Sequence, residues 1–472
     1  MKVFLSLGWM VWVVSACSSG ALQSKRGSKA PASGVSNDSQ SLAQQGDTTS
    51  GCKITIQGCP SGTLGSAAVT STTEYFDTYE GANTNKQRCL QRVLDQKIWC
   101  QSNNVSAQFL QSGKTIGKLQ DTRKVRVLAS GTHEATNVTD EILLGQGEDK
   151  TILVPSASLN VANIKNSYVS GLTYRGMGSL TSTSHYSGGV VLNQNAMLQY
   201  VTVEKSKNIG IQILGNDVTL KYVTSQDNLN GISAGTWFNA DQPIGWYTER
   251  LTLENCVIRR NNRGITNPSW WNSPNDKYKY AGSDGKWYVD PIWFGGGGKF
   301  SFTKTVRIKN LQSYENRGPG LWFDTHNEDV EVRDSYAWSN TGHQDNPNQP
   351  NDAATAGGIG FVSEINFGPV LFINNRVSGN SQAGISVWES GNVTLKNNEF
   401  IGNPMEFRKM DRGSANGAPA FSLYNVTITG NKLQSGSSII GYDHLNGAGL
   451  LTLSRANQST FLSTFGIISY SP

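Results

Sequence analysis

One spacing recurs from residue 198 onward: a bulky apolar or branched residue is followed ten positions later by Asn. Four positions after the apolar residue there is often another Asn or Asp, and a Gly with an aliphatic neighbour comes soon after the later Asn. A fixed internal spacing is typical of repeat architectures, in which each unit buries its apolar face against the next. The seven pairs are Leu198/Asn208, Val218/Asn228, Leu251/Asn261, Val306/Asn316, Val330/Asn340, Val370/Asn380 and Val393/Asn403.

The length of the repeat and the alternation within it indicate stacked strands. The shortest intervals are 20, 23 and 24 residues, about one coil of a parallel β-helix. Apolar and polar side chains alternate, as at Leu251 and Leu253, which is the pattern of strands with one buried face. The chain is therefore predicted to be all-β, with residues 111–472 forming a single-stranded parallel β-helix, a solenoid. A β-sandwich or a propeller fits less well, because hairpin turns are scarce and the spacing is too short for a propeller blade.

The repeated Asn residues suit the turns between such strands. Asn tolerates the left-handed backbone conformation, and its amide can hydrogen-bond to neighbouring backbone groups. In stacked coils, these side chains are also expected to form ladders along the axis.

Composition excludes some classes of function. The formal net charge is +5, and charged residues make up 16% of the chain. This balance gives no reason to expect a nucleic-acid partner, which would require a clustered basic face. The abundance of Gly and of aliphatic strands is typical of a secreted β-rich protein and not of a disordered one.

The N-terminus resembles a bacterial lipoprotein signal. Lys2 precedes a short apolar stretch that is too short to span a bilayer, and this stretch ends in Val-Ser-Ala-Cys17. The resemblance implies that residues 1–16 are removed, that Cys17 is lipidated, and that the lipid anchors the protein to a membrane of the cell envelope. Ser18 favours the outer membrane. An ordinary signal peptide is the alternative, and residues 17–50 are predicted to be a flexible tether.

The remaining cysteines fall into two groups. Cys256 occupies a position that is apolar in other coils, so we expect it to be buried. Residues 51–110 are predicted to form an N-terminal cap region, with an amphipathic helix over 85–99 that covers the open end of the solenoid. A secreted protein favours disulfides within this region, and a continuous helix would separate Cys89 and Cys100 by about 16 Å, which favours cross-pairing. The disulfide candidates are Cys52, Cys59, Cys89 and Cys100.

Some coils are longer than others, which predicts loop insertions. Insertions in a solenoid project from the stack and often build a binding face. The first two are crowded with aromatic residues, whose flat apolar faces suit sugar rings; the alternative is that the rings pack beneath their own loops. The insertions are placed at 235–250, 267–300, 341–357 and 404–425, and the sugar-binding candidates within them are Trp237, Trp270, Trp271 and Trp287.

A second candidate site lies on one strand. If Leu321 faces the core, Trp322, Asp324 and His326 lie on the outside. Aligning Ile359 with Leu321 places Glu364 beside His326, and the following coil places Trp388 level with Asp324. Trp322 and Trp388 are therefore further sugar-binding candidates, expected on the solvent face. Such a cluster can perform acid–base catalysis or hold a cation such as Ca²⁺. The alternative is a solvated strand with ordinary surface charges.

The sequence here resembles a known family. The segment 316–324, followed by Asn340 and by the segment 358–365, resembles secreted bacterial right-handed β-helix proteins, a superfamily that includes pectate lyases, alginate lyases and mannuronan C5-epimerases. The resemblance covers roughly residues 110–440 and implies a right-handed solenoid. It says little about activity, because function depends on sites placed on the fold.

One local likeness concerns catalysis. Phe-Asp324-Thr325-His326 resembles the Asp-Pro-His segment of C5-epimerases, although Thr325 replaces Pro and Asn327-Glu328 follows where the family has Asp and Arg. The resemblance implies that Asp324 positions or neutralises the uronate carboxylate and that His326 is the base or acid at C5. A lyase would also need Ca²⁺ or a cationic side chain, and an inverting hydrolase would use a cluster of acids such as Asp324, Glu364 and Asp345. The candidate cations are Lys277, Lys279, Lys286, Arg408 and Arg412.

Three functions remain open from the sequence. The first is a lyase or epimerase acting on an acidic polysaccharide, the second is a non-catalytic lipoprotein that binds glycans or a cell surface, and the third is a structural envelope protein. The first two require exposed aromatic rings in a groove. Only the first also requires that Asp324, His326 and Glu364 converge.

Overall fold

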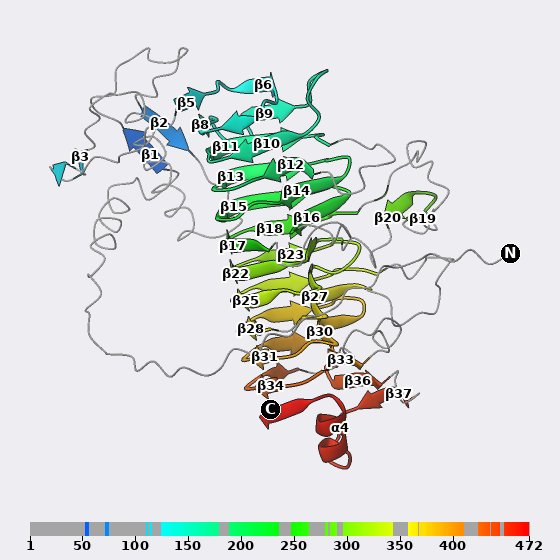
Figure 1. The fold of residues 1–472 in the computed structure, drawn as a ribbon. Helices are drawn as coiled ribbons and strands as arrows, with labels where there is room; N and C mark the ends of the chain where they lie inside the picture. The colour runs from blue at the N-terminus through cyan, green and yellow to red at the C-terminus, as the bar shows by residue number, and fades with distance from the viewer. Residues whose placement is uncertain are drawn as a thin grey trace, which may run out of the picture.

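The computed structural model describes most of the chain after residue 123. The described ranges are 124–178, 188–235, 247–262, 264, 284–289, 296–342, 357–366, 368–409, 423–434, 436–443 and 448–471, together with the backbone of short strands at 52–55, 71–74, 110–111, 114–115 and 279–281. Strands stack coil upon coil along one axis (Figure 1), as the repeat predicts.

One side of the stack is a twelve-stranded sheet, in which neighbouring strands come from successive coils and run parallel until the last pair. Its strands are β7 (Val138–Thr139), β10 (Ala162–Lys165), β12 (Gly188–Leu192), β14 (Ile209–Ile213), β16 (Asn230–Ala234), β21 (Gly298–Phe300), β24 (Leu321–Asp324), β27 (Ile359–Glu364), β30 (Ala383–Trp388), β33 (Met405–Lys409), β36 (Ile439–Asp443) and β37 (Ala448–Thr452).

Most of the remaining strands form two further stacks. The second stack contains β5 (Lys124–Val127), β8 (Glu141–Leu144), β11 (Tyr168–Arg175), β13 (Met197–Glu204), β15 (Val218–Gln226), β17 (Thr248–Glu254), β22 (Thr303–Lys309), β25 (Glu328–Arg333), β28 (Val370–Ile373), β31 (Val393–Lys396), β34 (Val426–Thr429) and β38 (Ile467–Ser471). The third contains β6 (Gly131–Glu134), β9 (Thr151–Val154), β18 (Val257–Arg259), β23 (Gln312–Tyr314), β26 (Tyr336–Trp338), β29 (Arg376–Ser378), β32 (Glu399–Ile401) and β35 (Lys432–Leu433). The long strands β11 and β15 pair with strands of both stacks, so these two stacks merge in the early coils.

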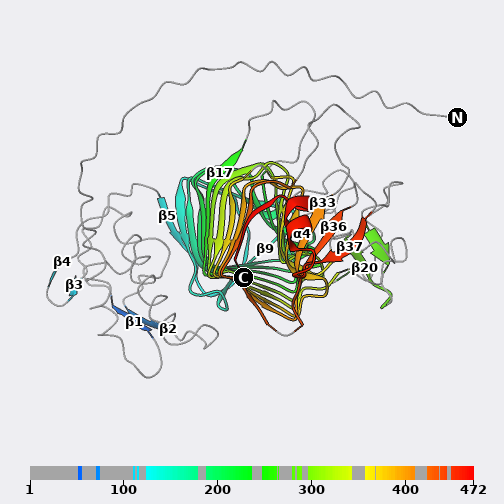
Figure 2. The ribbon, with the colours of Figure 1, turned by 90° about the horizontal axis from the view of Figure 1, so that it is seen from below.

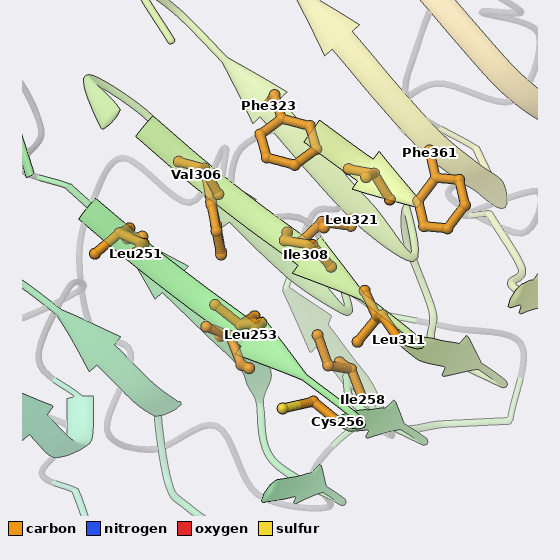
Figure 3. Close-up of a cluster of buried hydrophobic side chains, with 14 of the residues drawn as sticks. Leu251, Leu253, Cys256, Ile258, Val306, Ile308, Leu311, Leu321, Phe323 and Phe361 are labelled. Atoms are coloured by element: carbon orange, nitrogen blue, oxygen red, sulfur yellow. The ribbon is translucent and has the colours of Figure 1, made fainter. Parts of the chain in front are cut away.

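The core fills the space that these stacks enclose. Figure 2 shows the ribbon of the stacks from the end where the last helix lies. Alternate residues of each strand point inward, so Leu251 and Leu253 contact the next coil through Val306 and Ile308 (Figure 3). Cys256 lies in this core with 1% of its surface exposed, which confirms its prediction as a small buried residue.

In the five repeats that have an Asn or Asp four positions after the apolar residue, this residue forms the turn between the second and third stacks. Each has a left-handed backbone, with φ between 50° and 56°. Neighbouring turns are linked at the surface, as where Asn310 donates to Asn255 at 3.0 Å and Asn397 donates to Asn374 at 3.3 Å. The turn residues are Asn255, Asn310, Asp334, Asn374 and Asn397.

The Asn ten positions after the apolar residue forms the predicted ladder, buried at the turn into the twelve-stranded sheet. In each rung, the backbone N–H of one Asn donates to the side-chain oxygen of the next, at 3.0 to 3.2 Å. Asn208 is outside the ladder, because Ser206 occupies the first rung and donates its backbone N–H to Asn228. The rungs are Asn228, Asn261, Asn316, Asn340, Asn380 and Asn403. Shorter ladders through Asn327–Asn366 and Asn375–Asn398–Asn431 occupy the other two turns.

The C-terminal end of the solenoid is closed by elements that the repeat did not predict. Strand β37 turns back antiparallel to β36, and helix α4 (Gln458–Thr464) follows. Phe461 and Phe465 enter the core, with their ring centroids 4.7 Å apart. Their burial removes apolar surface that the last coil would otherwise leave in water.

The N-terminal predictions largely fall outside the described residues. The helix expected over 85–99 and the side chains of Cys17, Cys52, Cys59, Cys89 and Cys100 lie there, so the cap helix, the lipid site and the disulfides stay predictions. In the described part of that region, β1 (Cys52–Thr55) pairs antiparallel with β2 (Ser71–Glu74), and β3 (Leu110–Gln111) with β4 (Lys114–Thr115). Among the residues that the structure describes, no helix is both long and apolar enough to cross a bilayer.

Candidate functional site

The outward face of the twelve-stranded sheet carries an unusual density of buried charge. Along β24, Leu321 and Phe323 point into the core, while Trp322 and Asp324 point outward into a separate apolar cluster and its polar neighbours. The residues that follow Asp324 from strand to strand are Glu364, Trp388, Arg408 and Tyr442. Buried charges are costly unless they are paired or hydrogen-bonded, so this column requires a specific explanation.

The register of this column corrects one sequence-based prediction. Glu364 pairs with Asp324 and does not lie beside His326, because Leu321 aligns with Phe361 instead of Ile359. Alternation has a period of two, so the pattern Gly-Ile359-Gly-Phe361 offers two registers that bury the same face. The placement of Trp388 level with Asp324 is confirmed, through Glu364 between them.

The Asp324 carboxylate is held by two contacts. The Lys299 ammonium lies 2.8 Å from its Oδ2, and the Thr325 hydroxyl donates to its Oδ1 at 2.8 Å. The same ammonium lies 3.8 Å from the ring centroid of Trp322, a cation–π contact. Since 8% of Asp324 and 4% of Lys299 is exposed, this is a buried ion pair whose geometry is fixed from both sides.

Lys299 was not predicted from the sequence. It follows a run of glycines inside the insertion predicted over 267–300, but Gly298 and Lys299 begin strand β21. The glycines are needed because the neighbouring coil approaches closely: a Cβ at Gly297 would lie 2.2 Å from the Gly320 carbonyl oxygen. The sequence Gly-Lys-Phe could have indicated this strand, because it places one outward residue, Lys299, between two inward positions.

His326 is an extra residue at the corner of its coil. Two residues, Thr325 and His326, separate Asp324 from the ladder residue Asn327, whereas Ile365 alone separates Glu364 from Asn366 in the next coil. Both extra-turn residues are left-handed, at φ 54° and 56°. For a β-branched residue such as Thr325 this conformation costs about 1–3 kcal/mol, and strain of this kind clusters at functional sites.

The His326 imidazole is half-buried against Phe302 of the preceding coil, with centroids 5.4 Å apart and ring planes at 24°. Burial lowers the pKa of His326 below its usual value, while the charges of Glu328 and Asp324 oppose this shift. A neutral imidazole next to carboxylates can accept a proton near neutral pH.

Glu328 is itself anchored. It accepts a hydrogen bond from the Tyr247 hydroxyl at 2.9 Å and lies 3.3 Å from the Lys304 ammonium. Burial and the contact with Glu328 raise the pKa of Tyr247 to about 12, so the phenol stays protonated as a donor. This fixes the second carboxylate near His326.

The expectation that Trp322 and Trp388 are exposed platforms for sugars is wrong. Each exposes 2% of its surface, and their centroids lie 5.9 Å apart in an edge-to-face contact. One ring packs with Lys299 and the other with Arg408, whose guanidinium carbon lies 4.6 Å from the Trp388 centroid. They point away from the core as predicted, but side chains cover them.

Other candidates are only partly described. Trp287 belongs to strand β20 (Trp287–Val289), which pairs with β19 (Lys279–Ala281) as a hairpin in the second insertion, and its side chain is not described. Lys286 is exposed beside Asp284, and Arg408 is the sequence-predicted cation that lies on the outward face. In the described ranges, no group of three or more metal-binding side chains gathers, and the Ca²⁺ alternative stays untested. The positions outside the described residues are Trp237, Trp270, Trp271, Lys277, Asp345 and Arg412.

Comparison with known proteins supports the architecture. Residues 188–400 match the family model "Right handed beta helix region". The fold of this chain is a right-handed parallel β-helix. The β-helix has no significant match among curated protein sequences.

Solved structures with a similar course of the chain have varied functions. The A-module of the Azotobacter vinelandii mannuronan C-5 epimerase AlgE4 is 13% identical, with a TM-score of 0.45, over 67% of this chain and 83% of that one. The surface adhesin PfbA of Streptococcus pneumoniae is 12% identical, with a TM-score of 0.39, over 78% and 92%. The pectate lyase Pel9A is 13% identical, with a TM-score of 0.36, over 72% and 88%. Similarity at this level carries no argument about what the β-helix does.

Proposed function

We propose that this β-helix acts on an acidic polysaccharide by removing the proton at C5 of a uronate unit, as a lyase or an epimerase. The observation that carries the proposal is the corner of β24, where His326 is held in a strained, half-buried position beside a fixed Asp324–Lys299 pair. Both reactions begin with the same step, since the C5 proton lies α to the carboxylate.

In this proposal, the neutral His326 imidazole takes the C5 proton, and the electrons of the broken C–H bond move toward the uronate carboxylate. Lys299, whose position Asp324 sets, stabilises the developing negative charge in this proposal. In a lyase, the electrons then form a C4–C5 double bond and expel the glycosidic oxygen, which must gain a proton. In an epimerase, C5 regains a proton from the opposite face.

A second candidate is a non-catalytic glycan-binding protein. Only the catalytic candidate requires Asp324, His326 and Glu364 to converge, and the pairing of buried Glu364 with Asp324 instead of His326 favours the non-catalytic one. This candidate predicts glycan binding without any covalent change.

Proton NMR in D₂O separates these candidates. The mature protein is incubated with alginate, pectate and neutral glycans, with and without Ca²⁺. Unsaturated-uronate signals would identify a lyase, deuterium at C5 with a changed uronate ratio an epimerase, and new reducing ends alone a hydrolase. Unchanged glycans at high protein concentration would contradict the proposed reaction.

The proposal predicts the direction of a pH dependence. Burial lowers the pKa of His326 below its usual value of 6.5, so the imidazole stays mostly neutral down to that pH. The value of kcat/KM should therefore decrease only at a pH below 6.5. Glu328→Gln removes a charge that raises this pKa, so the acid limb should move further down. Measuring kcat/KM from pH 4 to 9 checks both shifts, and an acid limb above 6.5 would exclude His326 as the base.

We further propose that Cys17 carries a lipid that attaches the protein to the cell envelope, at the outer membrane. The support is the signal-like sequence before it and the polar segment after it. Cys17→Ser is expected to move the protein from the membrane fraction to the soluble fraction, and intact-mass measurement of the wild type should show a diacylglyceryl adduct. An unmodified, soluble wild type would contradict the proposal.

A further inference from the structure

Arg408 lies on β33, three strands beyond Asp324 in the same outward column, with 0% of its surface exposed. Its guanidinium is flanked by the residues that pair with it on both sides: the Trp388 centroid lies 4.6 Å away and the Tyr442 centroid 5.3 Å away. Two aromatic neighbours hold the planar group in one orientation.

Glu406 fixes one edge of the guanidinium. Arg408 Nε donates to Glu406 Oε1 at 2.5 Å. The same carboxylate accepts from Trp388 Nε1 at 3.1 Å, from Ser386 Oγ at 3.2 Å and from Gln382 Nε2 at 3.4 Å. The negative charge of Glu406 is therefore shared among four donors, and the carboxylate contacts the arginine only through Nε.

The other edge of the guanidinium, made by Nη1 and Nη2, has no hydrogen-bond partner among the described residues, and both atoms are buried. Trp322 Nε1, on the same outward face, is likewise a buried donor without a described acceptor. Buried donors are nearly always satisfied, so these three nitrogen atoms call for an acceptor that the described residues do not supply.

We propose that the Nη1–Nη2 edge of Arg408 is a carboxylate-binding subsite for a uronate unit other than the one that reacts. Two parallel N–H donors match the two oxygens of a carboxylate, and the aromatic rings on either side exclude water from the pair. The inference rests on the proposed function for its ligand class. Three inter-strand spacings, about 14 Å in all, separate Arg408 from Asp324, so the polysaccharide would lie along the axis of the solenoid.

The test is equilibrium binding of an oligouronate and of its carboxyl-reduced, neutral counterpart, measured by calorimetry. His326→Gln protein is used so that no turnover interferes. The protein with Arg408 intact should bind the oligouronate more tightly than the neutral oligosaccharide. Adding Arg408→Gln should weaken binding of the oligouronate by about 10- to 100-fold and leave binding of the neutral oligosaccharide unchanged. Arg408→Lys, which keeps the charge and loses the two-pronged geometry, should fall between them. Arg376→Gln, on the outer surface of the third stack, is the matched control and should bind as the parent does.

Two outcomes would overturn the subsite: equal binding of charged and neutral oligosaccharides by the parent protein, or equal losses for both ligands in Arg408→Gln. The first needs no Arg408 variant, so the proposal stays testable even if Arg408→Gln does not fold. The failures of the two proposals are also distinct. If binding depends on Arg408 but the wild type shows no turnover, the C5 reaction is contradicted and the subsite is supported. If the wild type turns over the polysaccharide but binding does not depend on Arg408, the subsite is contradicted and the C5 reaction is supported.

Discussion

His326→Gln is expected to reduce turnover of an acidic polysaccharide by about 10²–10⁴-fold, the usual contribution of a positioned general base. Gln retains hydrogen bonding but cannot accept the C5 proton. The fold should remain, because His326 is an extra residue at a corner and the ladder through Asn327 and Asn366 passes beside it. The measurement is the initial rate of uronate product formation, with the midpoint of thermal unfolding recorded in parallel.

The matched control is His133→Gln, since His133 lies in an early coil, where its ring contacts the Ala129 carbonyl oxygen. That variant should keep full activity. Wild-type rates in His326→Gln would remove His326 from the mechanism. A large fall in its unfolding midpoint would show that the residue holds the corner together and that its role is structural.

Asn316→Ala is expected to cost about 3–5 kcal/mol of unfolding free energy, a large effect for one side chain. The Asn316 amide group donates to the Ile258 carbonyl oxygen and to Asn340, while its oxygen accepts from the backbone and side chain of Asn261. All of these groups are buried, so Ala leaves several donors and acceptors without partners at once. Urea unfolding followed by circular dichroism gives the free energy.

Asn310→Gly provides the comparison within the same coil. Asn310 is one of the turn residues that are linked at the surface, through its hydrogen bond to Asn255. Its φ is 53°, a conformation that Gly adopts without strain. Its loss should therefore be a few tenths of a kcal/mol, because water replaces the exposed hydrogen bond. Similar losses in both variants would mean that the buried ladder follows the fold without stabilising it.

The repeat could be predicted because two physical requirements recur in every coil. A left-handed turn favours Asn or Asp, and a buried turn needs a side chain that both donates and accepts along the axis. Asn255 and Asn261 satisfy these requirements in one coil, and their equivalents do so in later ones. The closing helix α4 occurs once, so no spacing pointed to Phe461 and Phe465.

The site was harder to predict than the fold. Alternation specifies which face a side chain is on but not its coil partner, which is why Glu364 was placed two residues from its true neighbour. It also cannot tell whether an outward face is covered, so Trp322 was expected to be exposed. Lys299 was missed because glycines required by the close approach of two coils resemble a loop.

The antiparallel turn of β37 and the two phenylalanine rings at the end of the solenoid bear on how these molecules behave at high concentration. A stack of parallel strands can in principle continue from one molecule into the next, as it does in fibres. Here the final strand of the twelve-stranded sheet runs antiparallel to its neighbour, and Phe461 and Phe465 pack onto the core at this end. A second copy would have to displace both to extend the stack at this end, so the protein carries its own barrier to end-to-end polymerisation.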